Sequence, residues 1–200
     1  VCIFGIVTFS SSLIAQNCSD ESACNYSSSQ SYCIRVEPIA NHSGMVGTDN
    51  LDGMTTYRVY ALLENSDDVL SALIGDAEHP GYFNTTTEFF QHNIGGVTPS
   101  GINPAFINVF PSLAFDSWVT IGIEHVPTGD EGTISILEEG SEPWVNPFEN
   151  GGNIDLTGTL GGGWYTFSSY SNSIAGDDLE ILIGQFTTSG ELSGQIYMQV

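Results

Sequence analysis

The amino-acid sequence predicts an all-β protein: an antiparallel β-sandwich of jelly-roll or immunoglobulin-like type, with about eight to ten strands and almost no helix. Short segments rich in β-branched and aromatic residues recur along the chain, and several alternate between apolar and polar positions. Clusters of Gly, Ser, Thr and Asp separate these segments at spacings of roughly 8–15 residues, as turns between antiparallel strands do. No segment has a convincing amphipathic-helix repeat.

Seven segments carry strand patterns. Residues 54–64 alternate, with Tyr57, Val59 and Ala61 on one face. Residues 179–186 are apolar at both sets of positions, so we expect them in the middle of a covered sheet. Residues 192–200 alternate most regularly, which predicts a strand with one buried face. The expected strands are residues 54–64, 69–75, 117–124, 132–137, 164–168, 179–187 and 192–200.

The segments between these strands predict turns, single helical turns and one long excursion. Helix is expected only as one turn near residues 104–108 or 147–150. Residues 79–111 are divided by Pro and Gly into short pieces, which predicts an extended excursion over the sandwich. Long loops of this kind often carry binding residues.

The first 16 residues predict a secretory signal peptide. Residues 1–9 are almost wholly apolar, and the run ends at a small residue, Ala15, followed by Gln16. A membrane-spanning helix needs roughly 20 apolar residues, so this run is too short for one and fits a signal with cleavage near Ala15–Gln16. The alternative is a buried first strand of the fold. We therefore divide the chain into a signal remnant (1–16), a Cys-rich segment (17–34) and a sandwich domain (35–200) that we expect to continue beyond Val200.

The charge of the chain excludes several classes of partner. The sequence has 24 Asp and Glu residues against two basic residues, Arg35 and Arg58, giving a formal net charge of −22. Nucleic-acid binding is excluded because it needs clustered Lys and Arg, and anionic membranes are disfavoured for the same reason. Because salt bridges cannot neutralise so many carboxylates, we expect counter-ions, calcium above all, to stabilise the fold.

Three cysteines remain after the expected cleavage: Cys18, Cys24 and Cys33. In an exported chain an odd number indicates one disulfide and one remaining thiol, or a partner outside this sequence. All three pairings are open, and we favour Cys18–Cys33 because it closes the whole segment. Thiols without a nearby His fit a disulfide better than a zinc site.

Two acidic turns are candidate calcium sites. Asp49 and Asp52 flank one turn, and Asp177 and Asp178 lie in another, so that several oxygen ligands could converge. Neither turn matches a full EF-hand loop, and solvated turn residues are the alternative for both. The group Asp76, Glu78 and His79, just after an expected strand, is ambiguous in the same way.

No catalytic motif is present in the sequence. It has no G-x-S-x-G elbow and no H-E-x-x-H pair, and its four His residues are scattered. A glycosidase needs two opposed carboxylates, which so acidic a chain could supply anywhere. Aromatic residues are the remaining candidates for binding, because Trp118, Trp144 and Trp164, with Tyr165 and Tyr170, could stack on sugar rings. Trp118 lies in an alternating strand and fits the core better, whereas Trp144 lies in a Pro-bounded loop and is the best candidate for an exposed platform.

Two parts of the chain resemble secreted proteins. The unit Cys18-Ser-Asp-Glu-Ser-Ala-Cys24-Asn-Tyr26, closed by Cys33, resembles the C-x5-C-N-Y units of large surface proteins of marine bacteria, many of them exported by the type IX pathway. The rest resembles an uncharacterised β-rich module of the same secretome, on residues 53–60, 75–80, 115–122 and 175–179. The resemblance implies an extracellular location and a β-rich architecture, and it supplies no catalytic residues.

These observations together predict a secreted or cell-surface module that serves structure or adhesion without catalysis. Its expected partners are extracellular polysaccharide or other surface proteins, with no nucleic acid and no membrane insertion after signal cleavage. The alternative is a secreted carbohydrate-binding module or polysaccharide hydrolase.

Overall fold

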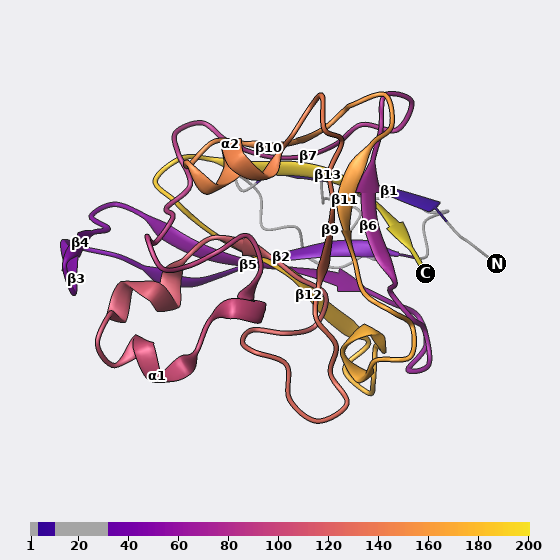
Figure 1. Cartoon of the computed structure of the whole chain (residues 1–200), viewed down its shortest axis with the longest axis horizontal. Helices are drawn as coiled ribbons and strands as arrows, with labels where there is room; N and C mark the ends of the chain where they lie inside the picture. Colours follow the sequence, from indigo (N-terminus) through magenta and orange to yellow (C-terminus); the bar gives the residue numbers. More distant parts are fainter. Residues whose placement is uncertain (1–3, 11–31) are drawn as a thin grey trace.

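The computed structural model describes residues 4–10 and 32–200, which form a β-sandwich of two antiparallel sheets (Figure 1). The seven-stranded sheet contains β1 (Phe4–Ser10), β6 (Ala72–Gly75), β7 (Gly81–Thr85), β9 (Ser135–Leu137), β10 (Ile154–Leu156), β11 (Gly162–Tyr165) and β13 (Leu192–Gln199). The four-stranded sheet contains β2 (Cys33–Asn41), β5 (Thr55–Leu62), β12 (Glu180–Thr188) and β8 (Trp118–Val119), in that order. A separate two-stranded ribbon pairs β3 (Met45–Val46) with β4 (Asp49–Asn50).

Two long strands of the larger sheet are interrupted at the same level. β1 pairs with one edge of β13. On the other edge, β7 pairs with the first half of β13 and β6 pairs with its last residues. Beyond them, β10 pairs with β7 and β11 pairs with β6. The register is the same on both sides of the interruption, with Leu156 opposite Gly81 and Gly162 opposite Gly75. If each interrupted pair is counted as one strand and the ribbon is set aside, nine strands form the sandwich, within the range that the sequence predicts.

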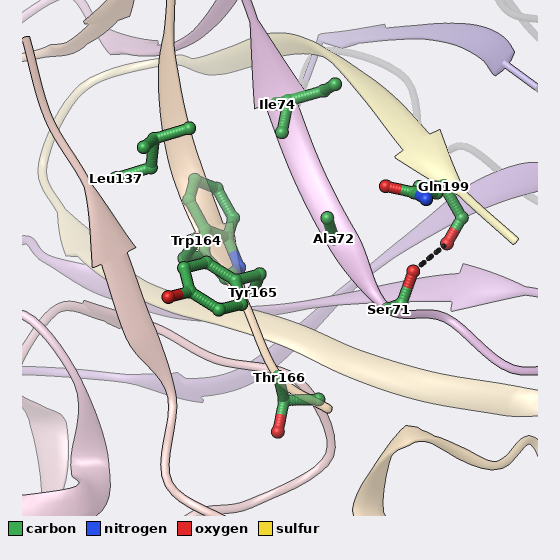
Figure 2. Close-up of a pocket in the computed structure, with 8 residues that line it drawn as sticks. All are labelled: Ser71, Ala72, Ile74, Leu137, Trp164, Tyr165, Thr166 and Gln199. Carbon is green, nitrogen blue, oxygen red and sulfur yellow. Dashed lines mark hydrogen bonds between the residues drawn. The ribbon is translucent and has the colours of Figure 1, made fainter. Parts of the chain in front are cut away.

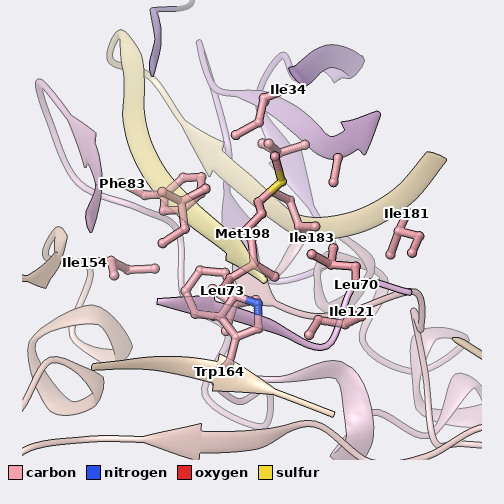
Figure 3. Close-up of a cluster of buried hydrophobic side chains, with 14 of the residues drawn as sticks. Ile34, Leu70, Leu73, Phe83, Ile121, Ile154, Trp164, Ile181, Ile183 and Met198 are labelled. Atoms are coloured by element: carbon pink, nitrogen blue, oxygen red, sulfur yellow. The ribbon is translucent and has the colours of Figure 1, made fainter. Parts of the chain in front are cut away.

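The hydrophobic core lies between the two sheets (Figure 3). Trp164, Leu73 and Met198 lie opposite one another on β11, β6 and β13 and point into it. Ile34 and Ile183 enter from the four-stranded sheet. Because successive side chains of a strand point to opposite faces, these residues place one face of each sheet in the core.

The expectation that residues 179–186 lie in a covered sheet is confirmed. β12 is central in its sheet, and all its residues after Glu180 are buried. Its outer face is covered by the excursion that follows β7, which places Ile102 and Leu113 against Trp118 and Leu182. The excursion contains η1 (Pro99–Gly101), α1 (Pro104–Ile107) and η2 (Pro111–Phe115).

Helix is confined to short turns, as the sequence predicts. Besides α1, the described residues contain α2 (Val145–Glu149) and η3 (Ser171–Ser173). None of the described helices is long and apolar enough to cross a membrane.

Some strands differ from the expectation. Of residues 117–124 only β8 pairs regularly, because the chain turns away at Gly122, whose φ is +72°. β2 is not among the expected strands, because Pro38 breaks its alternation. The register shifts between Pro38 and Ala40, and the edge position of β2 accommodates a residue that cannot donate to a ladder.

The structure places Phe4–Ser10 in the fold as β1, paired along β13 from Gln199 to Ser193. This is the arrangement that the alternative interpretation of the N-terminus predicts. The expected cleavage site near Ala15–Gln16, together with Cys18 and Cys24, lies outside the described residues, so cleavage and disulfide pairing stay predictions.

Candidate functional site

The outer face of the seven-stranded sheet carries a row of residues with a gap in it. Strand register aligns Leu137, Gly163, Ile74 and Tyr197 on β9, β11, β6 and β13. Gly163 is required here, because a Cβ atom would collide with the carbonyl group of Leu73. The space between Leu137 and Ile74 is therefore left unfilled.

A shallow hollow of about 270 Å³ lies at this gap (Figure 2). Leu137 and Ile74 lie on either side of it, and Tyr165 contributes an aromatic wall. Its polar groups are uncharged and come from Ser71, Thr166 and Gln199. The Ser71 hydroxyl donates a hydrogen bond to the backbone carbonyl of Gln199 at 3.2 Å.

A second hollow of about 230 Å³ adjoins the first and shares Ile74 with it. It lies where β6 and β7 are interrupted and is lined also by Gly75, Asp76, His79 and Tyr197. The His79 ring meets the Tyr197 ring edge to face, with centroids 5.0 Å apart. We call these two hollows together the outer-face groove.

Asp76 gives the outer-face groove one negative charge. Its Oδ1 atom accepts hydrogen bonds from the backbone N–H groups of His79 (2.6 Å) and Glu78 (2.8 Å). The first of these bonds is the main reason that the pKa of Asp76 lies below its usual value. Asp76 is therefore an ionised hydrogen-bond acceptor at the edge of the groove.

Exposed aromatic rings extend from the groove beyond β11. The Phe167 ring lies 6.3 Å from that of Tyr165 and 5.9 Å from that of Tyr170, both in edge-to-face geometry. Phe167 is 61% exposed and Tyr165 is 37% exposed. Contiguous exposed apolar surface of this kind marks interaction sites.

A different hollow, of about 400 Å³, lies on the outer face of the smaller sheet. It is lined by Tyr60 and by four acidic residues, namely Glu124, Glu131, Asp178 and Glu180. Arg35 donates to Glu180 at 2.7 Å and stacks on Tyr60, and Arg58 pairs with Glu124. Burial alone would lower the pKa of Arg35 and of Arg58. The hydrogen bonds and charges of these carboxylates outweigh it, so the pKa of both arginines is raised. Both basic residues of the chain are thus paired at this sheet.

A buried carboxyl group lies under the excursion. Asp116 is 0% exposed, and its two oxygens accept from the N–H groups of His92 (2.7 Å) and Gly96 (3.1 Å). Burial, together with the charge of Glu149, raises the pKa of Asp116 to about 7, against the effect of these hydrogen bonds. Burial also raises the pKa of Glu149.

The prediction of an exposed platform at Trp144 is wrong, because Trp144 is only 2% exposed. α2 folds its loop onto the core, where the Trp144 ring packs against those of Phe148 and Trp164, and its Nε1 donates to the Leu137 carbonyl at 3.0 Å. Although Trp144 borders a shallow hollow, too little of it is exposed for a sugar to stack on it. Trp164 is buried as well, whereas Tyr165 and Phe167, beside the groove, are exposed.

The candidate calcium ligands are not brought together. Asp52 accepts from the N–H group of Gly44 at 2.9 Å, and Asp49 from the Ser112 hydroxyl at 2.6 Å, so both hold local structure. At the other candidate site, Asp177 and Asp178 are exposed in the turn before β12, and Asp178 lines the hollow of the smaller sheet. Within residues 4–10 and 32–200, no three His, Cys, Asp or Glu side chains gather in a group that could hold a metal ion.

Sequence reasoning missed the groove as a unit. Asp76, His79 and Tyr165 were among its candidates, but Leu137, Ile74 and Gly163 were not. The run of three glycines at 161–163 was an available signal, because glycine in a strand often marks a close backbone approach.

In comparisons with known proteins, no protein-family model, no curated protein and no solved structure matches the chain.

Proposed function

We propose that this chain is a non-catalytic module of an exported protein and that it adheres to an extracellular surface through the outer-face groove. The observation that carries the proposal is the groove itself, with the exposed rings of Tyr165 and Phe167 beside it. Soluble proteins rarely leave such apolar surface open unless it binds something. The resemblance to secreted surface proteins supports the same location.

Binding is favoured over catalysis by the distribution of the carboxyl groups. Glycoside hydrolysis needs two of them facing one another, one with a raised pKa. The groove has a single carboxylate, Asp76, whose pKa is lowered. The carboxyls with raised pKa, Asp116 and Glu149, line neither part of the groove.

A polysaccharide hydrolase is the second candidate, and the four carboxylates of the hollow on the smaller sheet favour it. Two of them, Glu124 and Glu180, are engaged by arginines, which opposes their use as acid or base. We expect no release of reducing ends from a panel of neutral and anionic polysaccharides. Release that Glu131→Gln or Asp178→Asn abolishes, at the two carboxylates of this hollow that no arginine engages, would establish the hydrolase instead.

Replacing Phe167 by Ala is expected to weaken adhesion at least about fivefold, which corresponds to roughly 1 kcal/mol. The measurement is adsorption of the full chain to cellulose, chitin, agarose and gelatin coats. Phe106→Ala is the matched control, because Phe106 is 51% exposed on α1, in the excursion over the other sheet. Equal adsorption of both variants, or no adsorption of the wild type to any coat, would contradict the proposal.

Calcium is expected to act on this chain as a screening counter-ion. The net charge of −22 is not balanced by two arginines, so added salt should raise the melting temperature. Because the described carboxylates form no metal-binding group, calcium chloride should raise it no further than sodium chloride at equal ionic strength. A further rise with the logarithm of free calcium, reversed by chelator, would reveal a specific site.

Export is proposed together with a disulfide. Cys33 is buried at the start of β2, and we expect it to pair with Cys18 in the exported protein. Peptide mapping without reduction should find Cys18 and Cys33 in one linked fragment, whereas a link that includes Cys24 would support one of the other pairings. The intact mass of the exported protein should correspond to a chain that begins at Asn17, and a mass that retains Phe4–Ser10 would favour β1 as a permanent strand.

A further inference from the structure

We infer that the outer-face groove binds a neutral polysaccharide, with consecutive sugar residues in its two hollows. This inference rests on the proposed adhesive function and names the chemistry of its ligand. It follows from the walls of the groove, from its charge and from the way its two hollows adjoin.

The walls of the groove match the two kinds of surface on a pyranose ring. The exposed rings of Tyr165 and His79 offer aromatic surface to the apolar C–H face of a sugar, and the buried Tyr197 ring supports that of His79 from below. The hydroxyl and amide groups of Ser71, Thr166 and Gln199 border the first hollow, where sugar hydroxyls need partners. Small-molecule sites typically combine such an apolar lining with a few polar groups that fix orientation.

Charge selects against an anionic polymer. The chain has only two basic residues, both on strands of the smaller sheet and both paired with carboxylates there. Among the described residues that line the groove there is therefore no Lys or Arg to meet a sulfate or uronate group, and the one His, His79, lies 3.3 Å from the Asp76 carboxylate. Asp76 would repel such groups, as would the net charge of −22.

A strongly basic protein partner is also disfavoured. Asp76 is the one acidic residue that lines either hollow of the groove, whereas a docking surface for Lys and Arg would present several carboxylates. Such a surface exists on the smaller sheet, around Glu124 and Asp178. The contrast between the two faces favours an uncharged, amphipathic ligand for the groove.

The two hollows lie on neighbouring strands and share Ile74, so a linear ligand would cross the strands from β9 towards β13. One sugar would rest against Tyr165, above the small residue Ala72. The next would rest against His79, where Asp76 accepts from its hydroxyl groups.

The test is affinity electrophoresis of the full chain in native gels that contain a soluble neutral β-glucan, galactomannan or xylan, or alginate as the anionic comparison. We expect retardation by at least one neutral polymer and none by alginate. Tyr165→Ala should abolish the retardation, Tyr165→Phe should keep most of it because the ring remains, and His79→Ala should reduce it several-fold. Phe106→Ala should migrate as the wild type does, and thermal melts should show that each variant is folded.

Each other outcome overturns a defined part of the inference. Retardation by alginate alone would overturn the ligand class, and retardation unchanged by Tyr165→Ala would overturn the site. If no neutral polymer retards the chain but the gelatin coat retains it in a way that Phe167→Ala abolishes, the adhesive function stands with a protein partner. If the chain binds neither polymer nor coat, the proposed function fails as well.

Discussion

The protein is expected to lose stability as pH rises from about 4 to about 8, and Asp116→Asn should remove most of that loss. The pKa of Asp116 is raised to about 7 by burial, above the value of an unfolded Asp. The folded state therefore binds more protons between these two values, so the free energy of unfolding falls as pH rises through them. A shift of about three pKa units corresponds to roughly 4 kcal/mol.

Urea unfolding of both proteins across this pH range measures the effect. At low pH the Asn variant should be the less stable, because its amide cannot accept from both His92 and Gly96. Asp155→Asn is the matched control, since Asp155 is exposed on β10, and it should keep the wild-type slope. Parallel slopes for wild type and Asp116→Asn would show that Asp116 is already ionised below pH 5.

Phe186→Ala is expected to destabilise the fold by about 3–5 kcal/mol. The Phe186 ring, on β12, stacks on that of Phe83 at 4.9 Å and lies 5.3 Å from that of Phe89, so it joins the two sheets. Removing it leaves a cavity that the surrounding rings cannot fill.

The matched control is Phe167→Ala, the same substitution at an exposed site, which should change stability by less than about 0.5 kcal/mol. Denaturant unfolding at a fixed pH compares the two variants. Phe186→Leu provides a smaller loss that remains measurable if the Ala variant does not fold. Similar losses at positions 186 and 167 would contradict the placement of the core.

The strands that the sequence predicts correctly are those whose pattern is local. β12 has apolar residues at both sets of positions and β13 alternates, so each could be recognised from its own residues. β2 could not, because Pro38 breaks the alternation and only the pairing with β5 shows that a bulge absorbs it. Likewise, β10 has three residues and is defined by its register with β7.

The candidate site was less predictable, because it depends on register between distant strands. Leu137, Gly163 and Ile74 are far apart in the sequence, and only pairing brings them into one row. The burial of Trp144 depends on α2 turning back onto the core, which a Pro-bounded loop does not reveal. Tyr165 was identifiable as a candidate from its residue type, but only the structure shows that it faces outward while the preceding Trp164 faces the core.

The central claim, that this chain binds its ligand at the outer-face groove, is tested most directly by mapping amide chemical shifts in the labelled full chain. The titrant is a soluble oligosaccharide of the neutral polymer that retards the chain most. The account predicts that the largest shifts fall at Ile74, Leu137 and Tyr165, with smaller ones at His79. Shifts concentrated instead at Tyr60, Asn172 and Asp178, around the acidic hollow of the smaller sheet, would contradict it.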